Sequence, residues 1–252
     1  MAANARNTRR SNPLFCFSGI TVVVAMTGYI VTRWPVTLET IFESYNGDVS
    51  VAPKAFKLFA GHLALELVNT LDLRFSTETT ELLPAYADLL RLVTELRLLT
   101  PEQARRLGRT VGEKDARRVL SSTIELREAL ASLLYGHIDG SKPQAAQVET
   151  LEKHFHAAAL HRRLSPADGQ LVWSWSGVEQ QAEIPLWKLA QAASDLLVSS
   201  DAERVKDCGD PTCRWLFLDT SKNHTRRWCD MKTCVNRMKA RRHQARYQHG
   251  GA

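Results

Sequence analysis

The 252-residue sequence lacks the features that mark the extreme structural classes. It has no internal repeat and no low-complexity tract, and its 44% hydrophobic and 24% charged residues are ordinary for a globular protein. This composition excludes collagen-like, intrinsically disordered and multi-span membrane chains. The sequence also lacks a phosphate-loop motif, a Gly-x-Ser-x-Gly motif and an H-E-x-x-H motif, each of which marks a common enzyme class. We therefore expect a globular protein that is not an enzyme.

Cysteine is scarce outside one short stretch. Of the five cysteines, four lie within the 27 residues that end at Cys234, and Cys16 stands alone. A secreted protein held by disulfides usually distributes its cysteines through the fold, so this concentration favours metal ligands in a reducing compartment. Cys16 is expected to be an inert apolar residue.

Acidic residues are scarce at the C-terminal end. From Cys208 onward there are ten Lys and Arg against three Asp and Glu, a net charge of +7. The preceding 207 residues carry 23 basic and 24 acidic residues, a net charge of −1. The whole excess of positive charge therefore lies in the last 45 residues, which suggests a polyanion-binding segment on a neutral body.

Residues 1–55 are interpreted as an N-terminal extension. Three arginines precede a mostly apolar run at residues 14–31, which is the layout of a signal peptide or signal anchor. Serines, threonines and glycines dilute the run, and the positive-inside rule would direct the basic C-terminal segment outward, away from nucleic acid. A poorly structured extension, or the product of an upstream start codon, is the favoured interpretation. Membrane anchoring by residues 14–31 is the minor alternative, and we expect a cytoplasmic, nucleoid-associated protein.

Residues 56–200 are predicted to form an α-rich domain. Apolar residues recur at three- and four-residue intervals, and Thr100 with Pro101 gives a strong helix start. Residues 171–176 alternate and are rich in β-forming residues, which predicts a strand without an evident partner. The predicted helices span about 63–72, 84–99, 116–138, 145–164 and 185–198, with another starting at residue 100. The fold class is therefore mainly α, with a small β element, followed by a small four-cysteine zinc finger at residues 201–252.

The cysteine spacing predicts the metal site. The pattern is Cys208-x4-Cys213-x15-Cys229-x4-Cys234, in which each close pair can lie on one tight turn. Four thiolates bind zinc tetrahedrally and leave no open position, so we expect one structural Zn²⁺. The alternatives from the pattern alone are two disulfides or four free thiols. Trp215, Leu216, Phe217 and Trp228 are expected to form the small apolar core of the finger, or one tryptophan stacks on a base.

Residues 232–247 contain neither proline nor glycine and are predicted to form a basic helix. Cys234, Met238 and Ala245 are expected to face the zinc core, with the basic side chains on the exposed arc. Such a helix suits phosphate contacts and major-groove base edges. The predicted nucleic-acid contacts are Lys222, Arg226, Arg227, Arg237, Lys239, Arg241, Arg242 and Arg246.

Residues 219–237 resemble the CGNR zinc finger of bacterial transcription regulators. The name-giving tetrapeptide reads Cys234-Val235-Asn236-Arg237, with Val235 in place of the family glycine. Residues 59–72 similarly resemble the opening of the ABATE domain that usually precedes this finger, and residues 126–130 resemble its central helix. The resemblance covers about 56–247 and implies a stress-responsive regulator that binds DNA through the finger, with the ABATE-like domain as a sensor or dimerisation module.

Other interpretations of the chain remain open. An RNA-binding module, or a protein-interaction module that docks an acidic surface, would use the same basic helix. His154, His156 and His161 do not share one helical face, so we expect them to be exposed rather than catalytic. Asn69 and Asp72 would either serve as buried caps or line a pocket for a small-molecule or protein effector, and a homodimer is compatible with the sequence.

Overall fold

The computed structural model describes residues 54–249 except Ser176, and of residues 245–249 it describes the backbone alone. The apolar run at residues 14–31, including Cys16, lies outside the described residues, so its interpretation stays a prediction. In the part of the chain that is described, none of the helices combines the length and the apolar character needed to cross a membrane.

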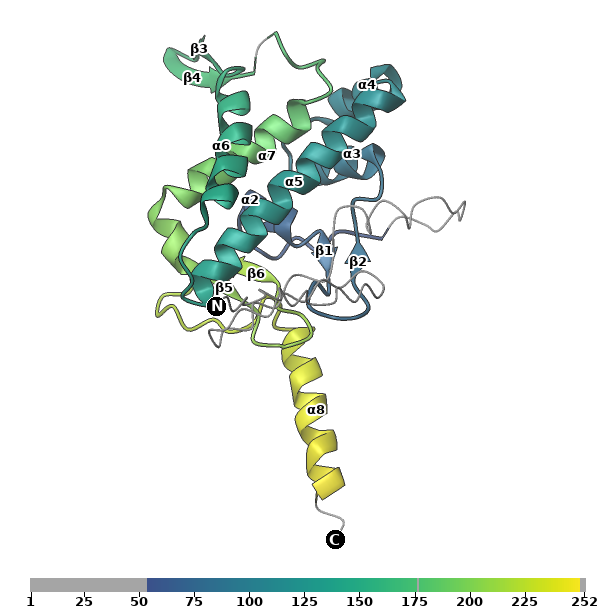
Figure 1. Cartoon of the computed structure of the whole chain (residues 1–252), viewed down its shortest axis with the longest axis vertical. Coiled ribbons are helices and arrows are strands. Elements are labelled where there is room, and N and C mark those ends of the chain that lie inside the picture. The colour runs from purple at the N-terminus through teal and green to yellow at the C-terminus, as the bar shows by residue number, and fades with distance from the viewer. Residues whose placement is uncertain (1–53, 176, 250–252) are drawn as a thin grey trace, which may run out of the picture. The chain divides into compact units, whose positions relative to one another are not determined.

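Helices dominate the described chain, and three small two-stranded antiparallel sheets accompany them (Figure 1). The helices are α2 (Leu63–Val68), α3 (Tyr86–Glu95), α4 (Pro101–Thr110), α5 (Glu113–Ile138), α6 (Ala145–Ala159), α7 (Ile184–Leu197), the 3-10 helix η1 (Ser200–Arg204) and α8 (Cys234–His249). The strand pairs are β1 (Leu71–Asp72) with β2 (Thr80–Glu81), β3 (Arg163–Ala167) with β4 (Gln170–Ser174), and β5 (Val205–Asp207) with β6 (Leu216–Leu218). The mainly α fold class with a small C-terminal four-cysteine module is confirmed.

The start of α4 is built as the sequence predicts. The Thr100 hydroxyl accepts a hydrogen bond from the Gln103 amide at 3.2 Å, and the Gln103 side chain accepts one from the Thr100 amide at 2.9 Å. Pro101 occupies the first helical turn, where its missing N–H costs no hydrogen bond. This reciprocal capping box satisfies two backbone donors that would otherwise lack partners.

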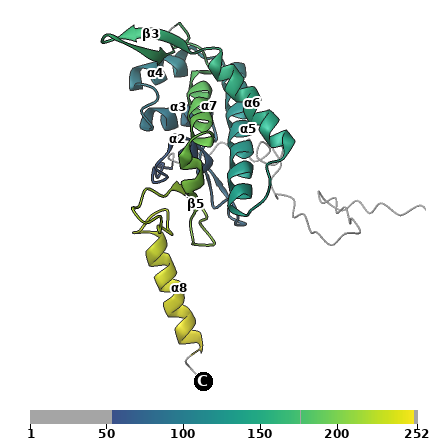
Figure 2. The same ribbon diagram turned by 90° about the vertical axis from the view of Figure 1, so that its left-hand side faces the viewer.

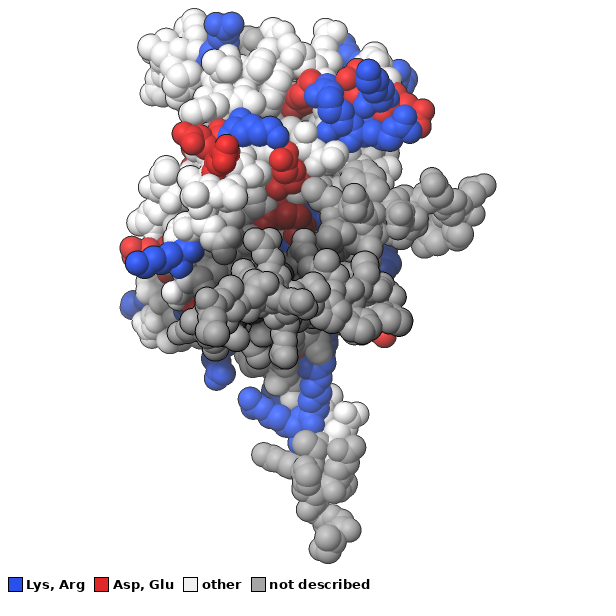
Figure 3. All heavy atoms as spheres, viewed as in Figure 1, with Lys and Arg blue, Asp and Glu red and all other residues white. Residues whose placement is uncertain are grey.

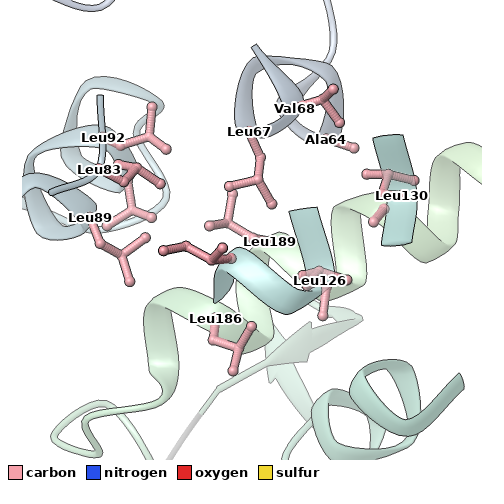
Figure 4. Close-up of a cluster of buried hydrophobic side chains, with 14 of the residues drawn as sticks. Ala64, Leu67, Val68, Leu83, Leu89, Leu92, Leu126, Leu130, Leu186 and Leu189 are labelled. Atoms are coloured by element: carbon pink, nitrogen blue, oxygen red, sulfur yellow. The ribbon is translucent and has the colours of Figure 1, made fainter. Parts of the chain in front are cut away.

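The core lies where α5 meets α2, α3, α6 and α7. Figure 4 shows leucines of α2, α3, α5 and α7 lying close together in this core. Leu67, Leu89, Leu126, Leu130 and Leu189 are completely buried. Each such side chain contributes about 1.5–3 kcal/mol through burial, so this packing holds the domain together.

The strand predicted at residues 171–176 is β4, and β3 is its partner. Helix α6 ends at Ala159 rather than near residue 164, and the next residues form β3, with Leu164 opposite Trp173 and Ala167 opposite Gln170. Asp168 and Gly169 connect the strands with positive φ values of 50° and 77°. An Asp-Gly pair between two short strands is a hairpin signal, so this signal could have identified the partner.

Two of the three histidines predicted to be exposed are not exposed. His154 is buried, and its Nε2 lies 3.1 Å from Glu125 Oε2. His161 is partly covered, and its ring stacks on Trp187 with 3.7 Å between centroids. His156 is exposed as predicted. The spacing of the histidines along the helix does not reveal that α6 packs against both α5 and α7. The prediction was therefore wrong for His154 and His161.

A buried carboxyl group in α2 should make folding stability depend on pH. Glu66 is 7% exposed and accepts a hydrogen bond from the Ala60 amide at 2.8 Å. Burial raises the pKa of Glu66 to about 7, although backbone N–H groups of residues 59–61 oppose the shift. The folded state therefore holds this proton at pH values where the unfolded chain has lost it. Stability should fall as pH rises from about 4.5 to 7, by about 3 kcal/mol.

Urea denaturation at pH 5 and pH 8 checks this expectation. Glu66→Gln keeps the acceptor for Ala60 but cannot ionise, so its stability should fall less between the two pH values than that of the unmodified protein. Glu102→Gln, at an exposed position of α4, is the matched control and should keep the original dependence. Equal pH dependence in all three proteins would contradict the assignment to Glu66.

Candidate metal centre and basic helix

The first cysteine pair lies on a turn at the end of the β5–β6 hairpin. The Cys208 amide donates to the Trp215 carbonyl at 2.9 Å, which continues the strand pairing beyond β5. The Asp210 carbonyl then accepts from the amides of Cys213 at 2.8 Å and Arg214 at 3.0 Å, and this closes the turn. The hairpin thus brings Cys208 and Cys213 together from positions five residues apart in sequence.

The second pair lies at the start of α8. The Asp230 carboxylate accepts from the amides of Lys232 at 3.0 Å and Thr233 at 2.9 Å, and its carbonyl accepts from the Cys234 amide at 3.1 Å. Cys229 precedes this cap and Cys234 is the first residue of the helix. Val235, which replaces the family glycine, lies inside the first turn of α8 and has no positive φ, so this position does not need glycine.

The two turns are in direct contact. The Gly209 amide donates to the Arg227 carbonyl at 2.8 Å. A Cβ atom at Gly209 would lie 3.2 Å from that carbonyl oxygen and 3.4 Å from the Trp228 ring. A side chain at residue 209 would therefore crowd the contact that brings the second cysteine pair to the first.

The four thiols form one buried cluster. Their sulfur atoms all lie within 4.8 Å of one another, and each of the four residues is at most 8% exposed. The Cys213–Cys229 and Cys229–Cys234 sulfur distances are both 3.5 Å, far beyond the length of a disulfide bond, and all four cysteines are free. Tetrahedral zinc at about 2.3 Å from each sulfur needs neighbouring sulfurs about 3.8 Å apart, so the donor set and its spacing fit zinc.

A cation would relieve the electrostatic cost of several thiolates in one buried cluster. Interaction with the Cys208 thiol raises the pKa of the thiols of Cys213 and Cys229. Burial is the largest cause that raises the pKa of the Cys234 thiol. Several thiolates side by side are therefore unfavourable unless a cation compensates their charge.

Arg226, one of the predicted nucleic-acid contacts, is directed into the finger. Its Nε donates to the Trp228 carbonyl at 2.9 Å, and its Nη2 donates to the carbonyls of Cys229 and Phe59. The guanidinium also lies over the Phe217 ring, 4.5 Å from the centroid. Arg226 donates its hydrogen bonds mainly to backbone carbonyls around the second cysteine pair. This side chain therefore stabilises the turn that carries Cys229 and Cys234.

The other predicted contacts fall into two groups. Lys222, Arg227, Lys239 and Arg242 are exposed, whereas Arg237 and Arg241 are partly covered and pair with the buried Asp210. The backbone of Arg246 continues α8, but its side chain is not described. Figure 3 shows lysine and arginine spheres gathered on the described part of α8.

The helix α8 was predicted to lie along the zinc core, but it does not. It leads away from the cysteine turns in both views (Figures 1 and 2), so Cys234 is buried at its start while Met238 is only partly covered. Ala245, the third residue of the predicted inward stripe, has no described side chain. More of α8 is therefore exposed than expected from the prediction that Cys234, Met238 and Ala245 face the zinc core.

Strand β6 and the residue before it, Trp215, contribute side chains to two apolar cores. Leu216 and Leu218 lie in the core of the helical domain, whereas Trp215 and Phe217 lie with the four cysteines. Because side chains alternate along an extended chain, one short segment covers both cores. Leu216 was expected in the core of the finger, and this expectation is wrong.

Asn69 and Asp72, which the sequence left as caps or pocket residues, hold the finger to the helical domain. The Asn69 amide group donates to the Leu216 carbonyl at 2.9 Å, and its carbonyl oxygen accepts from the Leu216 amide at 3.0 Å. The Asp72 carboxylate accepts from the Trp215 indole N–H at 2.9 Å, and the Tyr135 hydroxyl donates to the Arg214 carbonyl at 2.7 Å. We call these bonds, together with Leu216 and Leu218, the seam.

Two family profiles match this chain in sequence order. The ABATE profile, described as "Putative stress-induced transcription regulator", matches residues 61–200. The profile of the CGNR zinc finger matches residues 204–247. A comparison with curated proteins finds no match. The two matched ranges meet at η1, directly before β5 and the seam.

Proposed function

Because the chain belongs to the ABATE family, whose profile is described as "Putative stress-induced transcription regulator", and carries a CGNR zinc finger after that domain, we propose that it is a transcription regulator whose finger binds duplex DNA. One structural Zn²⁺, held by Cys208, Cys213, Cys229 and Cys234, would supply the bonds that lock the two turns together. The four thiolates would fill the coordination sphere, so we assign the site a structural role and the protein no catalytic one. The proposed place of action is the cytoplasm, at the nucleoid.

The observation that carries the proposal is the character of α8. Its 16 residues include five Lys and Arg and no Asp or Glu, and no apolar face runs along it. A helix that is polar on all sides gains little from packing on its own protein. Its length of about 24 Å and its positive charge suit a major groove about 12 Å wide between two rows of phosphates.

The helical domain is proposed to act as a sensor or dimerisation module. The seam supports this role, because a rearrangement of α2 or α5 in response to an effector would move Asn69 or Tyr135 and thereby β6. An RNA-binding or protein-docking function of α8 is the alternative. A salt-dependent comparison of ligands separates these functions.

Binding of fluorescent duplex DNA, RNA and heparin across a salt series tests the proposal. We expect duplex DNA to be preferred, with an affinity that falls steeply with salt. Replacing Lys222, Arg227, Lys239 and Arg242 with glutamine should lower the log–log salt slope by about 0.9 for each phosphate that is no longer neutralised. Replacing four cations of the helical domain, Arg105, Arg106, Arg109 and Lys114, which are all exposed, is the matched control.

The control variant should bind DNA like the unmodified protein. Equal losses in both variants would show that binding depends on charge in general rather than on the finger and its basic helix. Preference for RNA would favour the RNA-binding alternative. Binding to heparin alone, or to none of the three ligands, would overturn the proposal of DNA binding.

A further inference from the structure

Asp210 is the only residue between Cys208 and Cys213 that carries an acidic group, and it is completely buried. Its carboxylate accepts hydrogen bonds from the Thr212 amide at 3.1 Å and from the Thr212 hydroxyl at 2.9 Å. It also accepts from Arg241 Nη1 at 2.7 Å and from Arg237 Nη1 at 3.1 Å, one arginine on each oxygen. A single side chain of the first cysteine turn thus holds two successive turns of α8.

The two arginines need such a partner. Arg237 and Arg241 are four residues apart on one face of a helix, where two like charges destabilise the helix. A buried carboxylate between them converts this repulsion into two charge-assisted bonds. Thr212 adds its hydroxyl oxygen, which accepts from Arg241 Nη2 at 2.9 Å. These contacts form what we call the Asp210 clamp: Asp210, Thr212, Arg237 and Arg241.

The clamp also bears on the direction of α8. Cys234 holds the first residue of the helix in the four-cysteine cluster, and a single point of attachment does not by itself set the direction of the helix axis. Bonds to Arg237 and Arg241 fix it one and two turns further along. A helix held at three successive turns has one direction relative to the cysteine turns.

We propose that Asp210 is a positioning residue that orients α8 for nucleic acid, and that Arg237 and Arg241 serve the clamp instead of binding phosphates. This inference rests on the proposed function of the finger. It assigns the phosphate contacts to the cations outside the clamp, Lys222, Arg227, Lys239 and Arg242. Orienting the helix in advance lowers the entropy lost on binding, so the clamp would raise affinity without touching the ligand.

Asp210→Asn gives opposite results under the two explanations. If α8 acts only through its charge, removing a negative group from a basic module should tighten binding. If Asp210 positions the helix, binding should weaken by about tenfold despite the more favourable charge. Glu203→Gln is the matched control, because it removes the same charge at an exposed position of η1 and should change affinity less than about twofold.

The measurement uses the full-length, zinc-loaded protein and fluorescent duplex DNA at one fixed salt concentration, with zinc content determined for every variant. Asp210→Asn should keep its zinc and bind more weakly than Glu203→Gln. Equal or tighter binding by Asp210→Asn would overturn the proposal. If Asp210→Asn loses its zinc, amide exchange in the zinc-loaded double variant Arg237→Gln and Arg241→Gln decides the question instead. Without nucleic acid, exchange over residues 235–242 should be faster in this variant if the clamp holds α8, and unchanged exchange would overturn the proposal.

A combined variant tests whether the three residues act as one unit. Asp210→Asn alone and the double arginine variant change the charge in opposite directions, yet both should weaken binding to a similar extent. The triple variant should lose no more affinity than Asp210→Asn or the double arginine variant, because removing either side of the clamp already abolishes it. Additive losses would show separate roles for the arginines and contradict the clamp.

Amide hydrogen exchange along α8, measured without nucleic acid, separates failure of this inference from failure of the proposed function. Exchange over residues 235–242 should be faster in Asp210→Asn than in Glu203→Gln. If exchange differs between the two variants but the unmodified protein binds no nucleic acid, the clamp is supported and the proposed function is contradicted. Unchanged exchange would overturn the clamp whatever the protein binds.

Discussion

Replacing Cys229 with serine should release zinc and destabilise the helical domain together with the finger. The metal is expected to provide most of the folding free energy of the finger, because the cysteine-lined core contains few apolar side chains. The seam carries the effect into the helical domain, because Leu216 and Leu218 belong to the core of that domain.

The size of the effect follows from the seam. Losing the burial of two leucines costs about 1.5–3 kcal/mol each, and leaving the buried Asn69 side chain without its partners costs about 1–3 kcal/mol more. A total of about 5 kcal/mol is a large share of the stability of an ordinary domain. The midpoint of thermal unfolding, followed by helical circular dichroism, should therefore fall by about 10 °C or more.

Cys16→Ser is the matched control, because it makes the same chemical change outside the four-cysteine cluster. This variant should keep both its zinc, measured by elemental analysis, and its unfolding temperature. Cys229→Ser should lose zinc and unfold at a lower temperature. Loss of zinc with an unchanged unfolding temperature of the helices would show that the seam contributes little to the helical domain.

Replacing Arg127 with methionine should cost about 3–5 kcal/mol of folding stability. Arg127 is completely buried, and its guanidinium makes two bonds of 2.7 Å to the two carboxylate oxygens of Glu81. Its Nε also donates to Glu128 at 2.8 Å, and Glu128 pairs with the buried Arg74 as well. Removing the central cation leaves Glu81 largely buried without its partner, which is the costly step.

Chemical denaturation of three variants tests this interpretation of the network. Arg127→Met should be strongly destabilised, and adding Glu81→Leu should recover a substantial part of the loss, because the unpaired charge is then gone. Arg117→Met is the matched control, since its ion pair with Glu113 is exposed and should be worth less than about 1 kcal/mol. Equal costs at positions 117 and 127 would show that burial of the pair does not matter.

Several features of the site could be predicted because they depend on neighbours in sequence. Each cysteine pair lies on a turn of a few residues, so its spacing directly indicates a chelating pair. The cap at Thr100 and the helical periodicity of the core helices are equally local. The excess of positive charge in the last 45 residues is a property of composition and needs no fold to be detected.

Other features depended on contacts that no local pattern reveals. Asp210 was visible only as a residue of a turn, because its arginine partners lie 27 and 31 positions later. Arg226 looked like the other cations of its loop, but its internal contacts include the carbonyl of Phe59, 167 positions away. A charged side chain in a basic segment can face solvent or backbone carbonyls, and the sequence does not distinguish the two.

By itself, the sequence determined a mainly α domain followed by a four-cysteine module with a basic helix, since periodicity, capping and close cysteine pairs are short-range properties. The tertiary structure alone decided how the module is joined to that domain and which cations stay exposed. Asn69 and Leu216 are 147 positions apart, and they meet only because the apolar faces on either side of β6 are buried in two different cores. Burial is a property of the assembled fold, and it separates the arginines that hold the finger together from those exposed to a partner.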